Sequence, residues 1–219
     1  FKLARTANPL SGTELIQSLQ QVDLVFSLIH GAYGEGGELQ SLLEDHGIPF
    51  IGSSSSACRK AFDKFSANER LKQLGFFTYP QLLVEQSQPV SEAEQGIEAF
   101  FQDQGLERAV VKPTSGGSSI CVFSVATPKQ ALDKISEIFA RDIDHRVVIE
   151  PFVHGREFTC IVLQDREHRP VALLPTEIET DYDGHEIFDY RKKYLPTSQV
   201  IHHCPPRFDI SDIEAVRSQ

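Results

Sequence analysis

The stretch AVVKPTSGGSS, residues 109–119, decides how the fold of this chain is read. It begins as an apolar run of strand length and passes through Lys112 into a loop of small residues. The lysine offers one positive charge, and the loop offers consecutive backbone N–H donors that can wrap phosphate oxygens. A second apolar run, ICVF at residues 120–123, follows the loop. We therefore predict a hairpin with a phosphate-binding loop, and an ordinary hairpin turn is the alternative.

The residues on both sides of this hairpin predict a compact α+β lobe. Segments with apolar residues at helical spacing alternate with short apolar runs, which is typical of helices packed on a sheet. Helices are expected at residues 66–74, 91–102 and 128–140, and strands at 76–84, 109–113, 120–123 and 146–150.

The sequence before this lobe predicts a parallel α/β unit. The apolar run at 23–29 has strand length and leads into a glycine-rich loop. A helix at 38–46 and a second strand at 48–51 follow, and the order strand, helix, strand is typical of a parallel sheet. Ahead of them, Ser11 with Glu14 three residues later predicts a helix that starts with a capping box.

The residues after about 154 predict a third region. Apolar and polar side chains alternate there, as at Phe158, Cys160 and Val162. This pattern indicates antiparallel sheet, which is interrupted by a long polar loop at 180–197.

The composition excludes several classes of function. The 219 residues include 21 Lys and Arg against 31 Asp and Glu, a net charge of -10, so we expect no partner nucleic acid or anionic membrane. An anionic ligand must then be held by individual lysines and backbone N–H groups. The four cysteines have no zinc or disulfide spacing, which fits a reducing cytosol. No apolar run approaches the ~20 residues of a membrane span.

A second candidate site lies where the predicted strand at 146–150 ends. Glu150 and Glu157 offer carboxylates that can accept hydrogen bonds from an adenine amino group and from ribose hydroxyls. Phe152 between them can pack on a flat base. The alternative is a solvated strand end with Phe152 in the core.

Two further stretches carry candidate functional residues. HGAYGEGGELQ, residues 30–40, follows a predicted strand, at the place where open α/β sheets bind ligands. Its His30 and Glu35 can clamp a zwitterionic amino acid, or His30 can be an ordinary surface residue. FDYRKKY, residues 188–194, lies in the long polar loop, and its basic run can close on a terminal phosphate or simply be solvated.

Taken together and in this order, these stretches resemble the D-alanine–D-alanine ligase family of ATP-grasp carboxylate–amine ligases. Five ordered patterns in register between about Val22 and Pro206 are more specific than any one of them. The matches are His-Gly-x-x-Gly-Glu-x-Gly-x-Leu-Gln at 30–40, Gly52-Ser53 with Asp63-Lys64, Lys-Pro-x-x-x-Gly-Ser-Ser at 112–119, Glu-x-Phe-Val-x-Gly-x-Glu-Phe-Thr at 150–159, and Phe-Asp-Tyr-x-x-Lys-Tyr at 188–194.

The resemblance implies an ATP-grasp fold with three lobes. These would be an N-terminal parallel α/β, Rossmann-like lobe at 1–63 without its first strand, a central small α+β lobe at 64–153 and an incomplete C-terminal lobe at 154–219. It further implies ATP and D-alanine as ligands, with Mg²⁺ or Mn²⁺ held by a segment beyond Gln219. A cytoplasmic enzyme of peptidoglycan precursor synthesis is expected, and the resemblance implies a homodimer although no residue pattern here shows an interface.

The resemblance also implies a role for each matched residue. Lys64 and Lys112 would hold the nucleotide phosphates under the Ser118–Ser119 loop, and Tyr194 would pair with Ser118. The implied nucleotide group is Lys64, Lys112, Ser119, Glu150, Phe152, Val153 and Glu157, the catalytic group is Ser118, Lys193 and Tyr194, and the group for the first D-amino acid is His30 and Glu35.

The implied reaction transfers a phosphoryl group from ATP to a substrate carboxylate, and the amine of a second D-alanine then attacks the acyl phosphate. Tyr194 favours members of the family that form a dipeptide. The chain departs from the family pattern at Gly36, where Asp is usual, at Ser115 and Gly116, which replace larger polar residues, and at Cys121, where glycine is usual.

The two ends of the sequence add an expectation. The chain opens with Phe1, contains no methionine and ends before the implied metal-binding segment. We therefore expect part of a longer enzyme, which does not complete catalysis as the sequence stands. The alternatives are an ATP-grasp ligase for other amino acids and a shortened, non-catalytic nucleotide-binding relative.

Overall fold

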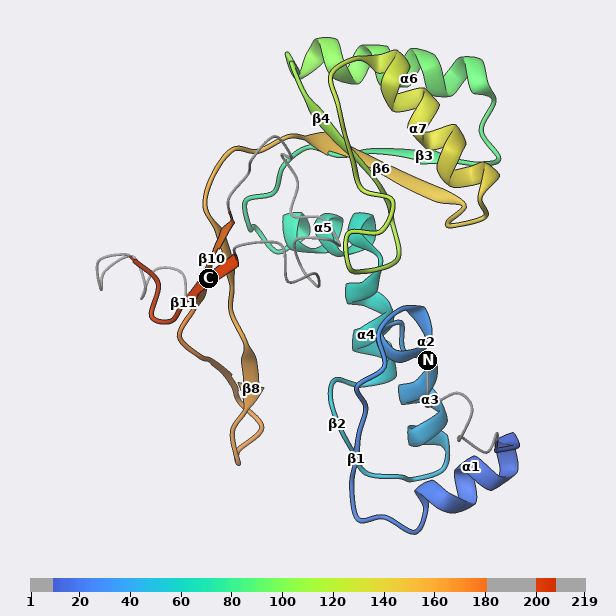
Figure 1. The fold of residues 1–219 in the computed structure, drawn as a ribbon, viewed down its shortest axis with the longest axis vertical. Coiled ribbons are helices and arrows are strands. Elements are labelled where there is room, and N and C mark those ends of the chain that lie inside the picture. The colour runs from blue at the N-terminus through green and yellow to red at the C-terminus, as the bar shows by residue number, and fades with distance from the viewer. Residues whose placement is uncertain (1–9, 181–199, 208–219) are drawn as a thin grey trace. The chain divides into compact units, whose positions relative to one another are not determined.

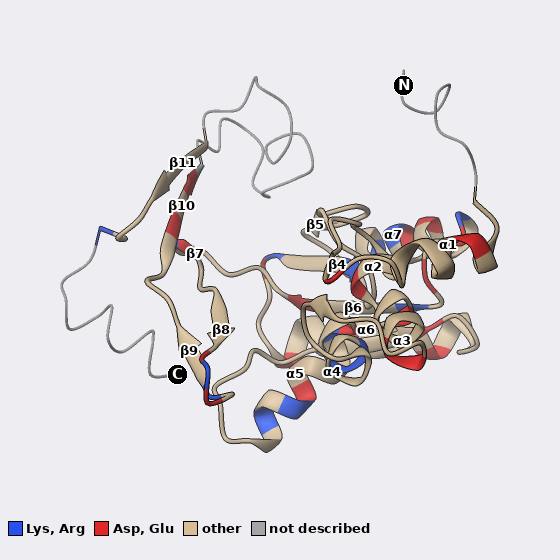
Figure 2. Ribbon diagram, turned by 90° about the horizontal axis from the view of Figure 1, so that it is seen from below, with Lys and Arg blue, Asp and Glu red and all other residues tan. Residues whose placement is uncertain are grey.

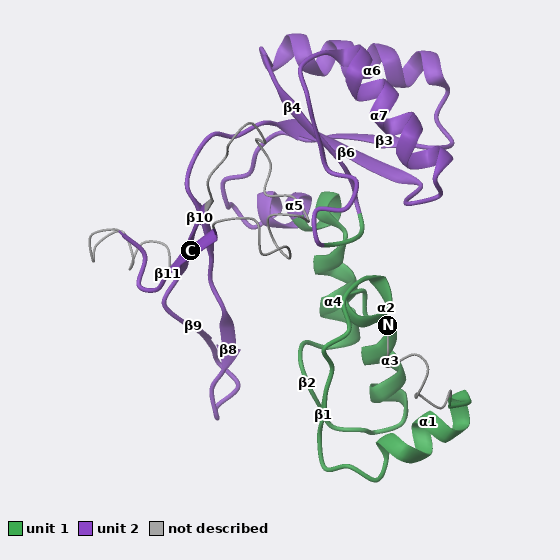
Figure 3. Ribbon diagram, viewed as in Figure 1, with its two compact units in different colours: residues 1–67, 115–117 green, residues 68–114, 118–219 purple. Residues whose placement is uncertain are grey.

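The computed structural model describes residues 10–180 and 200–207. The chain divides into two compact units (Figure 3). The first consists of residues 1–67 and 115–117, and the second of residues 68–114 and 118–219.

The first unit begins with helix α1, Gly12–Leu19. Ser11 Oγ accepts a hydrogen bond from the backbone N–H of Glu14 at 3.3 Å, and Glu14 Oε2 accepts one from the N–H of Ser11 at 2.8 Å. The two bonds satisfy donors that lack a partner inside the helix. The predicted capping box is therefore confirmed.

Two short strands of the first unit are parallel, as predicted. β1, Val25–Phe26, pairs with β2, Phe50–Ile51, and α3, Glu38–Asp45, lies between them in the chain. The predicted strand at 23–29 is wrong in length, because strand pairing in the described residues covers only two positions of β1. The small core of this unit consists of Leu39, Leu43 and Ile48.

The first unit is more helical than the sequence pattern indicates. α2, Ala32–Glu35, forms a helical turn inside the predicted glycine-rich loop. α4, Ser55–Phe62, was not predicted, because its serine-rich start is typical of a loop; Ser54 Oγ caps it by accepting from the N–H of Ala57 at 3.3 Å. α5, Lys64–Gln73, matches the predicted helix at 66–74 and has residues in both units.

The second unit contains a four-stranded antiparallel sheet with the order β3-β6-β4-β5 (Figure 1). β4 and β5 form the predicted hairpin around the glycine and serine loop. The strands are β3, Leu82–Glu85, β4, Ala109–Pro113, β5, Phe123–Val125, and β6, Arg146–Pro151.

Helices α6, Val90–Asp103, and α7, Pro128–Ala140, lie side by side over one face of this sheet (Figure 1). Strand residues alternate between the two faces. Ala109 and Val111 of β4 and Val147 and Ile149 of β6 pack in the core with the helices, whereas Lys112 and Glu150 lie on the opposite face together with Val148, which is also buried. The core includes Ile97, Ala109, Val111, Ile135, Ile138, Val147 and Ile149.

A second sheet of this unit has the antiparallel order β11-β10-β7. Its central strand is β10, Thr176–Thr180, flanked by β7, Glu157–Thr159, and β11, Val200–His203. A separate hairpin pairs β8, Val162–Gln164, with β9, Pro170–Ala172. The predicted antiparallel sheet after residue 154 is confirmed, while most of the predicted loop at 180–197 lies outside the described residues.

Two strand predictions for the central sheet were wrong in position. The strand predicted at 76–84 begins only at Leu82, because its pairing with β6 starts at Leu82 opposite Ile149. The strand predicted at 120–123 begins at Phe123, because Cys121 has a φ of 56° and does not continue an extended backbone.

Among the described residues, no helix has both the length and the apolar character that crossing a membrane requires.

Candidate functional site

The strongest candidate site lies on the face of the central sheet opposite α6 and α7. Lys112 on β4 and Glu150 on β6 reach each other diagonally, because the register places Glu150 opposite Val110. Lys112 Nζ donates to Glu150 Oε1 in an ion pair, and the two side chains keep 20% and 22% of their surface exposed. The structure thus brings together two residues that the sequence predicted in separate stretches.

A third side chain orients the carboxylate of Glu150. Gln81 Nε2 donates to Glu150 Oε2 at 2.9 Å, so each carboxylate oxygen has a different donor. Gln81 was not predicted. The strand register identifies Gln81. Leu82 pairs with Ile149, so the residue before it, Gln81, lies opposite Glu150.

The loop after β4 contains the residues whose backbone the sequence predicted to bind phosphate. Gly116, Ser118 and Ser119 have φ values of 119°, 57° and 54°, so the loop is held in conformations that L-residues rarely adopt. Lys64 at the start of α5 donates from Nζ to the carbonyl of Gly116 at 3.1 Å. The structure therefore places a second predicted phosphate ligand against the loop.

The residues predicted to line adenine surround the end of β6. The guanidinium of Arg108 lies over the Phe152 ring at 4.7 Å from its centroid, and the ring of His154 meets Phe152 edge-on at 4.8 Å. Val153 is 48% exposed. The ring of Phe152 is thus packed against polar neighbours, and Arg108 and His154 are site neighbours that the sequence analysis missed.

Glu157, predicted for the ribose, lies on β7 and is exposed. Its backbone position is set by pairing opposite Ile178 of β10.

His30 and Glu35 come together in the first unit. His30 Nδ1 lies 3.9 Å from Glu35 Oε1, and Glu35 Oε2 accepts from the N–H of Gly31 at 2.7 Å. A methyl group on Gly117 would lie 3.5 Å from Glu35 Oε2, so this carboxylate also borders the glycine and serine loop. Both side chains are open to solvent, with His30 75% and Glu35 45% exposed.

Several other residues of the stretch 30–40 serve packing. A Cβ on Gly34 would lie 2.0 Å from the carbonyl oxygen of Ile29, which excludes any side chain there. Gly37 combines a φ of 97° with a Cβ position 2.5 Å from the carbonyl oxygen of Ser55. Gln40, which is buried, donates to the carbonyl of Gly34 at 2.7 Å. The density of glycine in this stretch therefore shapes the loop that presents His30 and Glu35.

Two predicted catalytic residues, Lys193 and Tyr194, lie outside the described residues. Ser118, the predicted partner of Tyr194, is described and partly buried. Within residues 10–180 and 200–207, no group of three or more His, Cys, Asp or Glu side chains is arranged to hold a metal ion.

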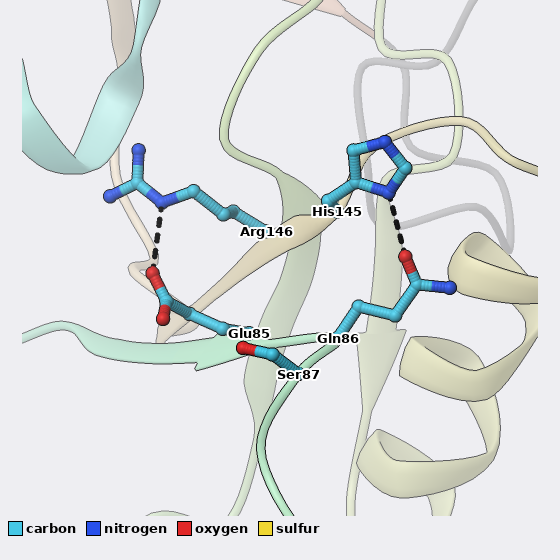
Figure 4. A pocket seen from close by; sticks show the side chains of 5 residues that line it. All are labelled: Glu85, Gln86, Ser87, His145 and Arg146. Carbon is cyan, nitrogen blue, oxygen red and sulfur yellow. Dashed lines mark hydrogen bonds and ion pairs between the residues drawn. The ribbon is translucent and has the colours of Figure 1, made fainter.

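A pocket of about 440 Å³ lies at the other end of β3 and β6 from Gln81 and Glu150 (Figure 4). Arg146 Nε lies 3.5 Å from Glu85 Oε1 on one side, and His145 Nδ1 lies 2.6 Å from Gln86 Oε1 on the other. Ser87 completes the lining. The sequence analysis did not predict this pocket, and it does not include any of the predicted site residues.

Comparison with known families gives two matches in chain order. The family described as D-ala D-ala ligase N-terminus matches residues 2–53, and the family described as D-ala D-ala ligase C-terminus matches residues 71–218. The second match alone covers more than half of the chain. The junction between the two matches falls near α4 and α5.

Individual relatives agree with the family matches. A D-alanine–D-alanine ligase of Pseudoalteromonas translucida is 32% identical over 197 residues, which cover 90% of this chain and 58% of the relative. A D-Ala:D-Ser ligase of Enterococcus faecalis has a TM-score of 0.72 at 27% identity, over 90% of this chain and 54% of that one. The Bacillus anthracis D-alanine–D-alanine ligase complexed with ATP has a TM-score of 0.70 at 24% identity, over 94% and 60%. The chain therefore spans less than two thirds of the length of each.

Proposed function

The chain belongs to the D-alanine–D-alanine ligase family, and from this membership and its site geometry we propose that it binds ATP in an enzyme that joins two D-alanines. The observation that carries the proposal is the Lys112–Glu150 pair, oriented by Gln81 and adjacent in the chain to a glycine and serine loop with positive φ values at Gly116, Ser118 and Ser119. Its fold is the ATP-grasp fold of its structural neighbours.

The nucleotide roles follow from the charges of this site. Lys112 and Lys64 supply positive charge for the phosphates, and the N–H groups around Ser118 and Ser119 supply hydrogen bonds. Glu150 accepts from the adenine amino group, and Glu157 accepts from the ribose hydroxyls. Phe152 and Val153 contribute apolar surface beside the base.

In the structure, Lys112 Nζ donates to Glu150 Oε1. ATP offers both partners a replacement, because its phosphates attract the lysine and its amino group donates to the carboxylate. We propose that nucleotide binding separates this ion pair or shares it with the ligand. The partial exposure of both side chains leaves them accessible for such an exchange.

We propose that residues of the stretch 30–40 in the first unit bind the amino-acid substrate. His30 and Glu35 bind the first D-alanine, with Glu35 also next to Gly117 of the loop. The phosphate of ATP passes to the carboxylate of this D-alanine, and the amine of the second attacks the acyl phosphate. Ser118, Lys193 and Tyr194 are proposed to act at this step.

The family resemblance also implies Mg²⁺. Within the described residues, no group of three or more His, Cys, Asp or Glu side chains is arranged to hold this ion, so these residues do not by themselves fit a metal site. A homodimer, a cytoplasmic location and the lobe boundaries at residues 63 and 153 are further proposals that rest on the family.

The first test measures ATP binding by the 219-residue chain with isothermal titration calorimetry. Lys112→Ala removes a charge-assisted phosphate contact, and we expect a loss of about 10- to 100-fold in affinity. Lys72→Ala is the matched control, because Lys72 is 69% exposed on α5 and lies 3.9 Å from Glu69 in an exposed ion pair. Equal losses in both variants would contradict the proposed site.

The second test follows phosphate release from ATP with and without D-alanine and weighs the product by mass spectrometry. Release that depends on D-alanine, with the mass of the dipeptide, supports the ligase. ATP binding without such release supports a non-catalytic nucleotide-binding relative.

A second amino acid is worth including in that assay. The Enterococcus faecalis structure is named a D-Ala:D-Ser ligase and is as similar in fold as any neighbour compared above. A preference for D-serine as the second substrate would change the product while leaving the nucleotide site as proposed.

A further inference from the structure

Three residues of the loop after β4 adopt a backbone conformation that is unfavourable for their residue types. Ser118, Ser119 and Cys121 have φ values of 57°, 54° and 56°, in the left-handed region that favours glycine. Such conformations persist only where the surrounding structure holds them. Contacts with the surrounding structure must therefore hold the loop in place.

One anchor fixes the residue from which the loop starts. Thr114 is 1% exposed, and its backbone N–H donates to the carbonyl of Arg146 at 3.1 Å. Its Oγ1 donates to Oδ2 of Asp144 at 3.0 Å. Asp144 lies 30 residues further along the chain, in the turn between α7 and β6.

The other oxygen of Asp144 holds the start of β6. Oδ1 accepts from the backbone N–H of Arg146 at 3.1 Å, and the side chain of Arg146 extends toward Glu85 in the pocket (Figure 4). A local turn needs only the bond through Oδ1. The bond through Oδ2 connects this turn to Thr114, so one carboxylate ties the end of β4 to the beginning of β6.

We propose that Asp144 is a positioning residue that holds the phosphate loop in its binding geometry through Thr114. The inference rests on the proposed function, in which Lys112 and the loop bind the phosphates of ATP. Asp144 does not contact the nucleotide. Its loss loosens the phosphate contacts and leaves the adenosine contacts at Glu150 in place.

Two pairs of variants separate the hydrogen bonds from a general loss of structure. Asp144→Ala removes both bonds, whereas Asp144→Asn keeps them, because its oxygen accepts from Arg146 and its amide donates to the threonine oxygen. Thr114→Val removes the hydroxyl at nearly constant size, whereas Thr114→Ser keeps it.

Asp165→Ala is the matched control. Asp165 Oδ1 stabilises the turn between β8 and β9 by accepting from the N–H groups of Glu167 and Arg169, each at 2.9 Å. The variant removes a turn-stabilising carboxylate of the same unit without touching Thr114.

The measurement compares the affinities of the 219-residue chain for ATP and for adenosine, with thermal unfolding recorded for each variant. For Asp144→Ala and Thr114→Val we expect ATP affinity to fall about tenfold and adenosine affinity to change by less than about twofold. Asp144→Asn, Thr114→Ser and Asp165→Ala should stay close to the wild type. Equal losses for both ligands, or unchanged ATP affinity, would overturn the proposal.

Hydrogen exchange without nucleotide tests the anchor independently. The amides of residues 115–121 should exchange faster in Asp144→Ala than in the wild type and Asp165→Ala, and unchanged exchange would overturn the proposal. If the wild-type chain binds no ATP, the proposed function fails, and the exchange result alone decides whether Asp144 holds the loop.

Discussion

The two larger sheets of the second unit are stabilised by different kinds of interaction. The sheet of β3, β4, β5 and β6 buries one face under α6 and α7, and Val111, Val147 and Ile149 are each 0% exposed. The sheet of β7, β10 and β11 has a charged residue, Glu177, in its middle strand, and this residue is only 2% exposed. Figure 2 shows the acidic positions along β10.

Glu177 is held by two arginines. Arg156 Nε donates to Oε1 at 2.9 Å, and Arg207 donates to the same oxygen from Nη2 at 2.8 Å and to Oε2 from its backbone N–H at 3.1 Å. The hydrogen bonds from Arg207, and then those from Arg156, hold the pKa of Glu177 well below its usual range. Glu177 in turn raises the pKa of Arg207 above its ordinary value.

The two sheets should therefore be destabilised by different changes. Apolar packing depends on shape and volume and responds little to pH or salt. A buried carboxylate between arginines depends on charge, and removing one partner leaves the others without compensation. The strands that carry Lys112 and Glu150 belong to the sheet with the apolar core, whereas Glu157 lies on β7 of the charged sheet.

The largest effect is expected from a cavity in the apolar core. Ile135→Ala on α7, at a residue that is 2% exposed, should lower the free energy of unfolding by about 2–5 kcal/mol. Urea denaturation measures this loss. The same substitution at Ile161, which is 59% exposed, should change stability by no more than about 0.5 kcal/mol, and a similar loss at both sites would refute the contrast.

The next effect is a local loosening of the charged sheet. Glu177→Gln removes the carboxylate that Arg156 and Arg207 share and leaves Arg207 paired with Glu179, so the amides of β7, β10 and β11 should exchange at least about tenfold faster. The amides of β4 and β6 should keep their protection. Uniform acceleration across both sheets would mean that they unfold as one cooperative element.

Acid should act on the charged sheet through the same residue. Because the folded pKa of Glu177 lies below its ordinary value of 4.5, its stabilisation is present above about pH 4.5 and is lost as the pH falls toward the folded pKa. Unfolding free energies measured from neutral pH down to about pH 3 should therefore decline. The decline should be smaller in Glu177→Gln, and identical slopes would exclude this origin.

The smallest effect concerns the helix cap of α7. Thr127 Oγ1 accepts from the N–H of Gln130 at 3.2 Å, so Thr127→Ala should cost about 1 kcal/mol. Thr127→Ser retains the acceptor and should be close to the wild type in thermal unfolding. A loss as large as that of Ile135→Ala would show that the cap supports more than the helix start.

Much of the central lobe was predictable from local patterns. Thr127 and Pro128 mark the start of α7, and Ala131, Ile135 and Ile138 lie at helical spacing on its buried face. The alternation in AVVKP indicated β4 and placed Lys112 on the face away from the core. The order of the motifs predicted Lys64, Lys112 and Glu150 as site residues. It did not predict the contact between Lys112 and Glu150.

Other site features depended on contacts between distant segments. Gln81 lies 69 residues from Glu150 and has no motif of its own, so only the register of β3 on β6 identifies it. In the sequence, Asp144 looks like an ordinary turn residue, and only the structure shows its hydrogen bond to Thr114. α4 was missed because serines at a helix start resemble a loop when the capping bond is unknown.

The sequence by itself determined the family and predicted the glycine and serine loop and the residues that we propose to bind ATP, because these depend on local chemistry at fixed spacing. Tertiary structure alone decided which side chains orient Glu150, which carboxylate anchors the loop, and why Glu177 can be buried. The physical reason is that hydrogen bonds and ion pairs act over a few ångströms in space, whereas a sequence pattern reports only neighbours along the chain.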